Sequence, residues 1–571
     1  MAAPDPAHTQ SSPSATAYKA GSGILTALGN LVGEVDTLGP GGMYCAQVAP
    51  EALLGAATTL RDSYGFRHLS LLTAIDHADA QGGLDLLYSF VRKTDGVEVA
   101  LRLTLAKDPL VAPSMAPAWP AANPLEREVF DLFGVRFENH PFLRRLVLRD
   151  DFKGHPLRKG FEMSPDGVPA AASQAAISDH GLVGPAGNDD VPGFPFMAEA
   201  GGGDPLMHSE RIVLNVGPQH PSTHGVLHLY VLLDGEKVIG AQPTQGYLHR
   251  CIEKLAESRT YKAVIPLMDR CDYVSSFHTE LAYVLALEEL LGVESTPKAD
   301  FIRVLMSELV RITSHHTWYT AAGLDTGALT PFLYAFIDRE LILDFFEEVT
   351  GGRMMFNYFR PGGVKDDIPP ESAEKLRKML AKFGESVDGY EDMLTGNEVF
   401  RVRTRGIGML SCEEIEAYSV TGPMARGSGY DIDLRRDAPY AAYGRIPVNV
   451  CLGTAGDTFD RYRVRVSEMR ESARIALAAL DGMPEGPHIA DGLPKSIKPP
   501  AGAAYRKVES PRGELGVLVM SDGTAKPWRV KVRSPALSNL HAAPCMLNDC
   551  QMGDIIPVVG SVDVVMGEID R

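Results

Sequence analysis

The order of hydrophobic and polar positions divides the chain into two parts with different periodicities. In the first part, residues 85–92 and 97–104 are apolar segments that flank the turn Lys93-Thr-Asp-Gly96, which predicts two strands joined as a hairpin. Residues 51–64 repeat their apolar side chains at helical spacing. The pattern predicts a small α+β domain over residues 22–163.

The second part, residues 207–571, is dominated by helical periodicity. Strand-like segments at 211–216 and 225–233 come first. The final stretch, which ends in Gly560-Ser-Val-Asp-Val-Val-Met-Gly-Glu-Ile-Asp-Arg571, again has strand-like patterns. We therefore predict a mainly helical domain with β elements at both ends, and an α+β protein overall. The predicted helices cover residues 279–291, 301–318, 330–349 and 370–394.

Two segments lack a regular pattern. Residues 164–206 are rich in Gly, Pro, Ala and Asn-Asp clusters and have almost no periodicity, which predicts a linker between the two domains. Residues 1–21 are rich in Ala, Pro, Ser and Thr, without the basic cluster and apolar core of a secretory signal. We predict a disordered tail there.

Composition narrows the possible functions. The 571 residues carry a formal net charge of -18, which disfavours a partner with a phosphate backbone and predicts no binding to nucleic acid. No run approaches the ~18 apolar residues of a membrane span. The seven cysteines are sparse and form no CxxC motif, so we expect this chain alone to bind no iron–sulfur cluster and no structural metal.

A loop rich in Gly, Pro and His, Gly217-Pro-Gln-His-Pro-Ser-Thr-His-Gly225, separates the first two predicted strands of the second domain. Pro218 and Pro221 restrict its conformations, so His220 and His224 should be presented rigidly. Their spacing would suit a metal on a helix, but two prolines make a helix improbable. Either these histidines serve a chemical purpose or they satisfy backbone groups of the loop.

Three further side chains are candidates for chemistry. Arg250 and Tyr273 lie between apolar segments, and Asp325 lies in a stretch of small, apolar residues, where a buried carboxylate normally needs a partner. A histidine and a tyrosine at opposite ends of an apolar cavity would supply the two protons needed to reduce a quinone. A carboxylate bonded to the imidazole would fix its tautomer. His224, Tyr273 and Asp325 suit these roles, but the sequence alone does not bring them together.

Long contiguous motifs resemble a known respiratory family. Leu125-Glu-Arg-Glu-Val-Phe-Asp-Leu-Phe-Gly-Val-Arg-Phe137, His140-Pro-Phe-Leu-Arg-Arg145 and Gly154-His-Pro-Leu-Arg-Lys159 are similar to the signature of the C subunit of bacterial complex I. Asn215-Val-Gly-Pro-Gln-His-Pro-Ser-Thr-His-Gly-Val-Leu227, Arg360-Pro-Gly-Gly363 and the final Gly-Glu-Ile-Asp-Arg571 are similar to its D subunit. The chain thus resembles a fused C/D subunit of NADH-quinone oxidoreductase, apart from the tail and the linker.

The resemblance implies a role for each candidate residue. In this family the D and B subunits enclose the quinone headgroup near a terminal [4Fe-4S] cluster, which the B subunit binds. His224 stands at the position of the quinone-binding histidine, Tyr273 at that of the quinone-binding tyrosine, and Asp325 at that of the aspartate that partners the histidine. Arg250 matches an arginine lying against the cluster. The C-like domain is a docking scaffold in this family.

The resemblance also implies an assembly and a location. We expect a peripheral-arm subunit of a proton-translocating oxidoreductase that transfers electrons from NADH, or another donor, to menaquinone or ubiquinone. The expected partners are the B, H and I subunits and other peripheral-arm subunits. The expected location is the cytoplasmic side of the cell inner membrane. The second domain should resemble the [NiFe]-hydrogenase large subunit in fold.

Three positions depart from the family pattern. Cys251 replaces a frequent glycine, and Cys271 replaces a frequent leucine. Met355 occupies a position near the terminal cluster that is histidine in many members, and a methionine cannot take up a proton. We therefore expect the redox potential of the cluster to be independent of pH, with a low-potential menaquinone as the acceptor.

Two other functions compete with this interpretation. A membrane-bound [NiFe]-hydrogenase large subunit would need two CxxC pairs, but Asp272 and Ser275 stand where the first pair would have cysteines. Cys545 and Cys550 are too far apart to form the second pair. The other alternative is a structural scaffold subunit without an active site, against which the presence of the histidine, tyrosine and aspartate argues.

Overall fold

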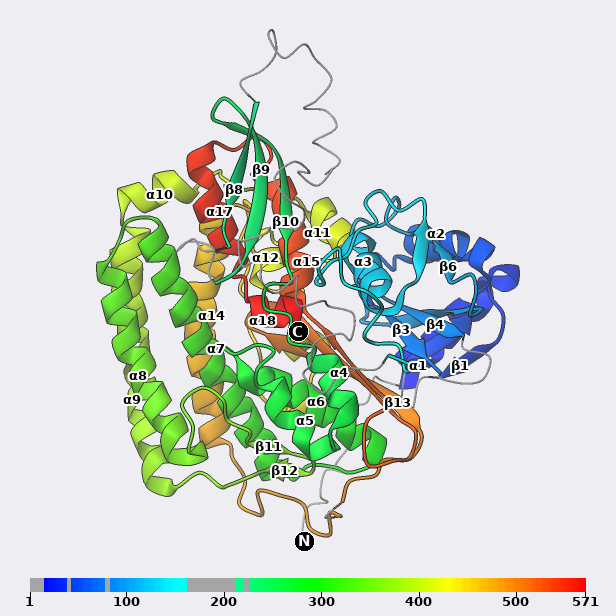
Figure 1. Cartoon of the computed structure of the whole chain (residues 1–571). Coiled ribbons are helices and arrows are strands. Elements are labelled where there is room, and N and C mark those ends of the chain that lie inside the picture. The colour runs from blue at the N-terminus through cyan, green and yellow to red at the C-terminus, as the bar shows by residue number, and fades with distance from the viewer. Residues whose placement is uncertain (1–14, 38–42, 78–82, 162–210, 219–224, 495) are drawn as a thin grey trace, which may run out of the picture.

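The computed structural model (Figure 1) places a sheet-rich N-terminal part beside a larger, mainly helical C-terminal part. The predicted linker over 164–206 lies outside the described residues, as do His220, His224 and most of the predicted tail. Residues 15–21 of that tail belong instead to a helix, which is held by the buried side chains of Leu25 and Leu28. The structure describes residues 15–37, 43–77, 83–161, 211–218, 225–494 and 496–571.

The N-terminal part is built on a five-stranded sheet in the order β1-β2-β5-β4-β3. The predicted hairpin is confirmed, because β4 and β5 pair antiparallel with Val91 opposite Glu98. The helix predicted over 51–64 is also confirmed. The elements are α1 (Ala15–Ala27), β1 (Val35–Thr37), β2 (Tyr44–Gln47), α2 (Leu53–Tyr64), β3 (His68–Asp76), β4 (Leu84–Val91), β5 (Glu98–Leu105), β6 (Val111–Pro113), α3 (Ala122–Phe133) and β7 (Arg136–Glu138).

In its described residues, the C-terminal part contains two three-stranded antiparallel sheets and one short two-stranded sheet. The first sheet has the order β10-β9-β8 and the second β13-β14-β15. The predicted strand at 211–216 is confirmed, and the one predicted at 225–233 begins at His228. The strands are β8 (Arg211–Val216), β9 (His228–Asp234), β10 (Lys237–Thr244), β11 (Phe359–Arg360), β12 (Gly363–Val364), β13 (Gly502–Ser510), β14 (Gly513–Ser521) and β15 (Arg529–Arg533).

Long helices form the body of the C-terminal part (Figure 1), and the four predicted helices correspond to α6, α7, α8 and α9. The side chain of Thr296 caps the first turn of α7, accepting a hydrogen bond from the Ala299 amide at 3.2 Å. The helices are α4 (Ile252–Ser258), α5 (Tyr261–Met268), α6 (Ser276–Leu291), α7 (Pro297–Asp325), α8 (Thr330–Thr350), α9 (Pro370–Tyr390), α10 (Glu398–Thr404), α11 (Cys412–Tyr418), α12 (Pro423–Gly427), α13 (Leu434–Asp437), α14 (Thr458–Asp481), α15 (Pro535–His541), α16 (Ala543–Leu547), α17 (Ile555–Val562) and α18 (Met566–Asp570).

The strand-like pattern predicted for the final stretch is wrong in its last part. The β sheet ends with β15, and the chain then forms α15 to α18. Helix α17 has apolar or small side chains on all sides because nearly all of it is buried, so its sequence lacks the alternation of an amphipathic helix. The chain ends near the centre of the molecule (Figure 1).

The two parts share one hydrophobic core. A single cluster of buried side chains includes Leu86 and Leu125 of the N-terminal part together with Leu229, Leu540 and Ile569 of the C-terminal part. The second large cluster lies within the C-terminal part, among its long helices and β13 to β15. Within the described ranges, the structure has no helix that is both long and apolar enough to span a membrane.

Candidate functional site

The turn between α5 and α6 holds Tyr273 in a half-buried position. Asp272 shapes this turn, since its Oδ1 accepts hydrogen bonds from the backbone amides of Val274 (3.2 Å) and Ser275 (3.1 Å). Burial raises the pKa of Tyr273, and the nearby Arg512 partly opposes that shift. The phenol therefore keeps its proton at neutral pH and is available as a proton donor.

Gly567 of α18 brings Tyr273 and Arg250 together. A Cβ atom at this glycine would lie 2.8 Å from Cε1 of Tyr273 and 3.0 Å from Nη2 of Arg250, so no larger residue fits here without movement. Arg250 itself is exposed, and its Nη2 donates a hydrogen bond to the carbonyl of Arg270. A fixed, exposed guanidinium thus lies beside a half-buried phenol.

Met355 also lies at this turn. Ser276, the first residue of α6, directs its hydroxyl toward the Met355 sulfur at 3.6 Å and donates to the carbonyl of Met354 at 2.8 Å. The structure therefore gathers three of the five predicted site residues around the turn between α5 and α6. These three are Arg250, Tyr273 and Met355.

Two buried acids hold the loop of residues 351–358, which contains Met355, against this turn. Asp269 accepts the Asn357 amide at 3.0 Å, and Glu280 accepts the amides of Tyr358 (3.0 Å) and Phe359 (2.8 Å). Burial raises the pKa of both acids, and the effect on Glu280 is increased by a hydrogen bond to Asp269. Their hydrogen bonds to three backbone amides position residues 357–359 against the turn.

Asp325 lines a separate cavity of about 270 Å³, of which Tyr273 is not a lining residue. It is the last residue of α7 and is half-buried. Trp318, Tyr462 and Ser561 line the same cavity. Ser561 belongs to α17, and Gly567 beside Tyr273 follows it six positions later. The same C-terminal segment therefore contacts both the cavity of Asp325 and the turn of Tyr273. The predicted contact between Asp325 and His224 stays a prediction, since His224 lies outside the described residues.

The described ends of the His-containing loop show why Gly217 is needed there. Its φ is +96°, and a Cβ atom would lie 2.1 Å from the Leu227 carbonyl oxygen, so only glycine fits.

Beyond the loop, the sequence did not lead us to His228 of β9. Its Nδ1 lies 3.1 Å from the hydroxyl of Tyr247, and burial lowers its pKa to about 4, so it is neutral at physiological pH.

A buried arginine beneath Tyr273 was also missed. Nη1 of Arg512 lies 2.8 Å from Asp272, and its Nη2 donates to the Ser314 hydroxyl at 3.1 Å. Its Nε donates to the Asp563 carbonyl oxygen at 3.1 Å and lies 3.6 Å from the Asp563 carboxylate. Asp272 and Arg512 thus form an ion pair although they lie 240 positions apart in the sequence. No local sequence signal indicates a pair between such distant residues.

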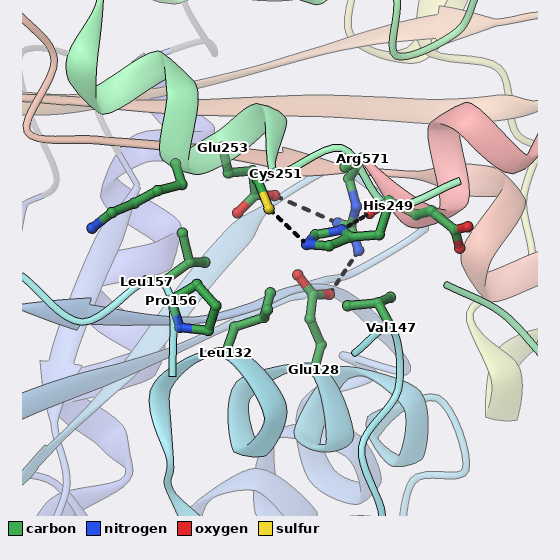
Figure 2. A pocket seen from close by; sticks show the side chains of 11 residues that line it. Glu128, Leu132, Val147, Pro156, Leu157, His249, Cys251, Glu253 and Arg571 are labelled. Atoms are coloured by element: carbon green, nitrogen blue, oxygen red, sulfur yellow. Dashed lines mark hydrogen bonds and ion pairs between the residues drawn. The ribbon is translucent and has the colours of Figure 1, made fainter. Parts of the chain in front are cut away.

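A cavity of about 350 Å³ lies where the two parts of the chain meet (Figure 2). Within it, Cys251 has a left-handed backbone with φ of +55°, which explains why glycine suits this position. Nδ1 of His249 donates to the Asp570 carbonyl at 2.6 Å, and its Nε2 lies 3.5 Å from the Cys251 sulfur. Arg250 therefore directly follows His249, which the C-terminal segment holds in place through the Asp570 carbonyl.

The positions where a hydrogenase would carry its first cysteine pair form hydrogen bonds instead. Asp272 pairs with Arg512, and the Ser275 hydroxyl lies 2.7 Å from Nδ1 of His278. Cys271 is buried, and burial raises the pKa of its thiol. Among the residues that the structure describes, no group of three or more His, Cys, Asp or Glu side chains could hold a metal ion.

Comparison with known proteins identifies the family. The family described as "Respiratory-chain NADH dehydrogenase, 49 Kd subunit" matches residues 325–497 and 492–571. A protein of Trichlorobacter lovleyi, named as the D subunit of NADH-quinone oxidoreductase, is 43% identical over 390 residues, which are 64% of this chain and 100% of the relative. The chain belongs to the family of NADH-quinone oxidoreductase D subunits.

Other relatives agree. The D subunits of Geotalea uraniireducens and Carboxydothermus hydrogenoformans are 46% and 45% identical, and in each case the match covers 64% of this chain and 100% of the relative. The family described as "Respiratory-chain NADH dehydrogenase, 30 Kd subunit" matches residues 46–166. This member of the D-subunit family therefore joins a 30 Kd-type and a 49 Kd-type sequence in one chain, as the fused C/D resemblance predicted.

Proposed function

We propose that this chain is the peripheral-arm subunit of a proton-translocating NADH-quinone oxidoreductase that forms the quinone-reduction site together with a partner subunit. The single observation that carries this proposal is the arrangement of Tyr273 and Arg250 against Gly567, in a member of the D-subunit family. The partner is the B subunit, whose terminal [4Fe-4S] cluster supplies the electrons. The donor upstream of that cluster is NADH or another carrier.

The chemistry follows from the state of Tyr273. Reduction of a quinone by two electrons requires a proton at each carbonyl oxygen, and the half-buried phenol holds its proton until the oxygen becomes basic. We assign the second proton to His224 and the orientation of that imidazole to Asp325. The quinone would thus be held between two donors from distant parts of the chain.

Arg250 and Met355 face the partner in this proposal. Arg250 is exposed on the isolated chain, and an arginine beside a reduced cluster would stabilise its added negative charge. Met355 is half-buried beside Ser276 and has no proton to exchange. Reduction of the cluster would therefore not be coupled to a proton at this position, which suits a low-potential menaquinone.

An exposed apolar stripe on α8 supports docking onto other subunits. Leu333, Ile337 and Leu341 are spaced by four residues and are 56%, 61% and 49% exposed, so they form one face of the helix. Helix α8 lies at the edge of the helical layer (Figure 1). We assign the B, H and I subunits as partners, at the cytoplasmic side of the inner membrane.

The domain arrangement is part of the same proposal. Residues 22–163 would form the C-type docking domain, and residues 207–571 the D-type domain with the fold of a [NiFe]-hydrogenase large subunit. In place of a metal centre, the D-type domain would hold Asp272 paired with Arg512. The ion pair neutralises both side chains, which suits a site for an uncharged substrate such as a quinone headgroup.

The test replaces Tyr273 with phenylalanine in the assembled complex. We expect kcat with quinone to fall by ~10²-fold or more, since the variant lacks the proton donor but keeps the ring. Tyr283→Phe is the matched control, because its hydroxyl donates to the Tyr261 carbonyl at 2.9 Å, away from the proposed site. Equal turnover in both variants would leave the chain as a scaffold.

A further inference from the structure

A buried carboxyl group beside the proposed site has no hydrogen-bond partner. Glu568 of α18 is 0% exposed, and neither of its carboxyl oxygens forms a hydrogen bond within the described part of the chain. Its neighbour Asp570, by contrast, accepts the amides of Gly246 (2.9 Å) and Leu248 (2.7 Å). A buried carboxylate without donors is strongly unfavourable, whereas the neutral acid avoids most of that penalty.

The charges around Glu568 favour the same state. Asp272, in the turn before α6, and Asp563, after α17, are anionic neighbours, and Arg512 from the β13–β14 turn is already bonded to both. Burial raises the pKa of Glu568 to about 8, with Asp272 as the second cause. The guanidinium of Arg512 therefore already interacts with two carboxylates before Glu568 is counted.

Among the residues that the structure describes, the other cations close to α18 are likewise already bonded. Arg250, whose guanidinium lies against Gly567, donates to the carbonyl of Arg270. Arg533 of β15 also faces Glu568, but its guanidinium donates to the backbone carbonyls of Ser70 and Ser419 at 3.2 and 3.3 Å and to that of Glu514. Helix α15 contributes His541, whose Nε2 lies 3.2 Å from the Gln245 side chain. Glu568 thus holds its proton because the guanidinium groups of Arg512 and Arg533, which face it, are already bonded to other groups.

Glu568 lies next in sequence to the residue that touches Tyr273. Gly567 contacts the Tyr273 ring, and Asp272 immediately precedes Tyr273 while also facing Glu568. Arg512 faces both titratable groups, since it affects the pKa of Tyr273 and that of Glu568. A neutral acid and the proposed phenol donor therefore share one buried environment.

We propose that Glu568 stores a proton and returns it to Tyr273 after Tyr273 has protonated the quinone. This inference rests on the proposed function of Tyr273. The reduced quinone oxygen takes the phenolic proton, which breaks the phenol O–H bond and leaves a phenolate. Glu568 then gives its carboxyl proton to the phenolate, directly or through water, and becomes a carboxylate facing Arg512. The two electrons come from the partner's iron–sulfur cluster, and solvent later reprotonates Glu568.

The first test uses the full chain alone. Infrared difference spectra between pH 6 and pH 9 should contain a band from a protonated carboxyl group that disappears in Glu568→Gln. A spectrum unchanged by the substitution would overturn the proposal. If the glutamine variant does not fold, Glu568→Asp is made in a chain whose glutamates carry ¹³C. The band should then move from the frequency of a labelled carboxyl to that of an unlabelled one, because the new aspartate carries no label. A band that stays at the labelled frequency would overturn the proposal.

The second test uses the assembled complex. We expect Glu568→Gln to lower kcat with quinone about tenfold above pH 7 and to change the pH profile, with reduction of the cluster unaffected. Glu289→Gln is the control, a carboxyl 2.6 Å from Arg506 at the far end of α6, and it should leave the profile unchanged. If Tyr273→Phe abolishes turnover but Glu568→Gln retains the native profile, only the proton store fails. If Tyr273→Phe turns over normally, the proposed function fails.

Discussion

The two parts of the chain meet at a buried ionic cluster, and a single substitution there should destabilise the whole protein. Glu128 of α3, only 4% exposed, lies 2.8 Å from Arg571 and pairs with Lys531 (Figure 2 shows the contact with Arg571). Glu253 of α4 is the second anion and lies 2.7 Å from Arg529. Two carboxylates thus balance three cations that all lie in the C-terminal part.

The substitution Glu128→Gln keeps the shape of the side chain and removes one of the two negative charges. Lys531 and Arg571 would then share only Glu253, at distances of 3.5 and 3.7 Å. Breaking a buried ion pair by neutralising one partner costs ~3–5 kcal/mol because the remaining charge stays buried. We expect a loss of that size in the free energy of unfolding, with no contribution from a cavity.

The assay is urea unfolding at pH 7, followed by circular dichroism and by the fluorescence of the three tryptophans. Arg377→Gln is the control, since the side chain of Arg377 is 41% exposed and lies 2.9 Å from the exposed Asp481. Such a surface pair contributes ~0–1 kcal/mol. A loss below ~1 kcal/mol for Glu128→Gln, equal to the control, would refute the view that this cluster joins the two parts.

Three further predictions concern pH, backbone strain and redox potential. Burial alone would raise the pKa of Glu253, but Lys531, Arg529 and the third cation of the cluster lower it to about 2. The stability that Glu253 contributes is therefore fully present above its ordinary pKa of 4.5 and is lost as the pH falls toward 2. Urea midpoints across this range should therefore fall less in Glu253→Gln than in the native chain, and equal slopes would contradict this. Cys251→Gly should raise the free energy of unfolding by ~0.5–1 kcal/mol, since relief of left-handed strain exceeds the added entropy of the unfolded chain, and a lower melting temperature would refute it. Met355→His should make the midpoint potential of the partner's cluster vary with pH in redox titrations, while a native midpoint that already varies with pH would rule out the proton-uncoupled interpretation.

The parts of the fold that could be predicted are those with local, one-sided burial. The hairpin of β4 and β5 has a turn signal between two apolar segments. Helix α14 was missed for the opposite reason. Its buried residues include Arg461, Arg465 and Glu468, which interrupt the apolar periodicity on which the prediction depends. Charged side chains that are buried with distant partners cannot be recognised from spacing along the chain.

The same limit applies to the site. Motif resemblance nominated Tyr273, Arg250 and Met355, and the structure brings them to one turn. Neither Arg512 nor Glu568 could be nominated from the residues alone, because their environment comes from segments far apart in sequence. The significance of Gly567 depends on the closeness of two side chains that no pattern in the sequence indicates.

The most direct test of the central claim follows electrons through the assembled complex in a single turnover. The complex with Tyr273→Phe is reduced by its electron donor, mixed with quinone and frozen at intervals. The [4Fe-4S] cluster that we propose for the partner subunit is followed by paramagnetic resonance. We predict that the cluster is reduced at the native rate and that quinone reoxidises it ~10²-fold more slowly, because the proton from Tyr273 is missing. Reoxidation at the native rate would contradict the assignment of the quinone site to this turn.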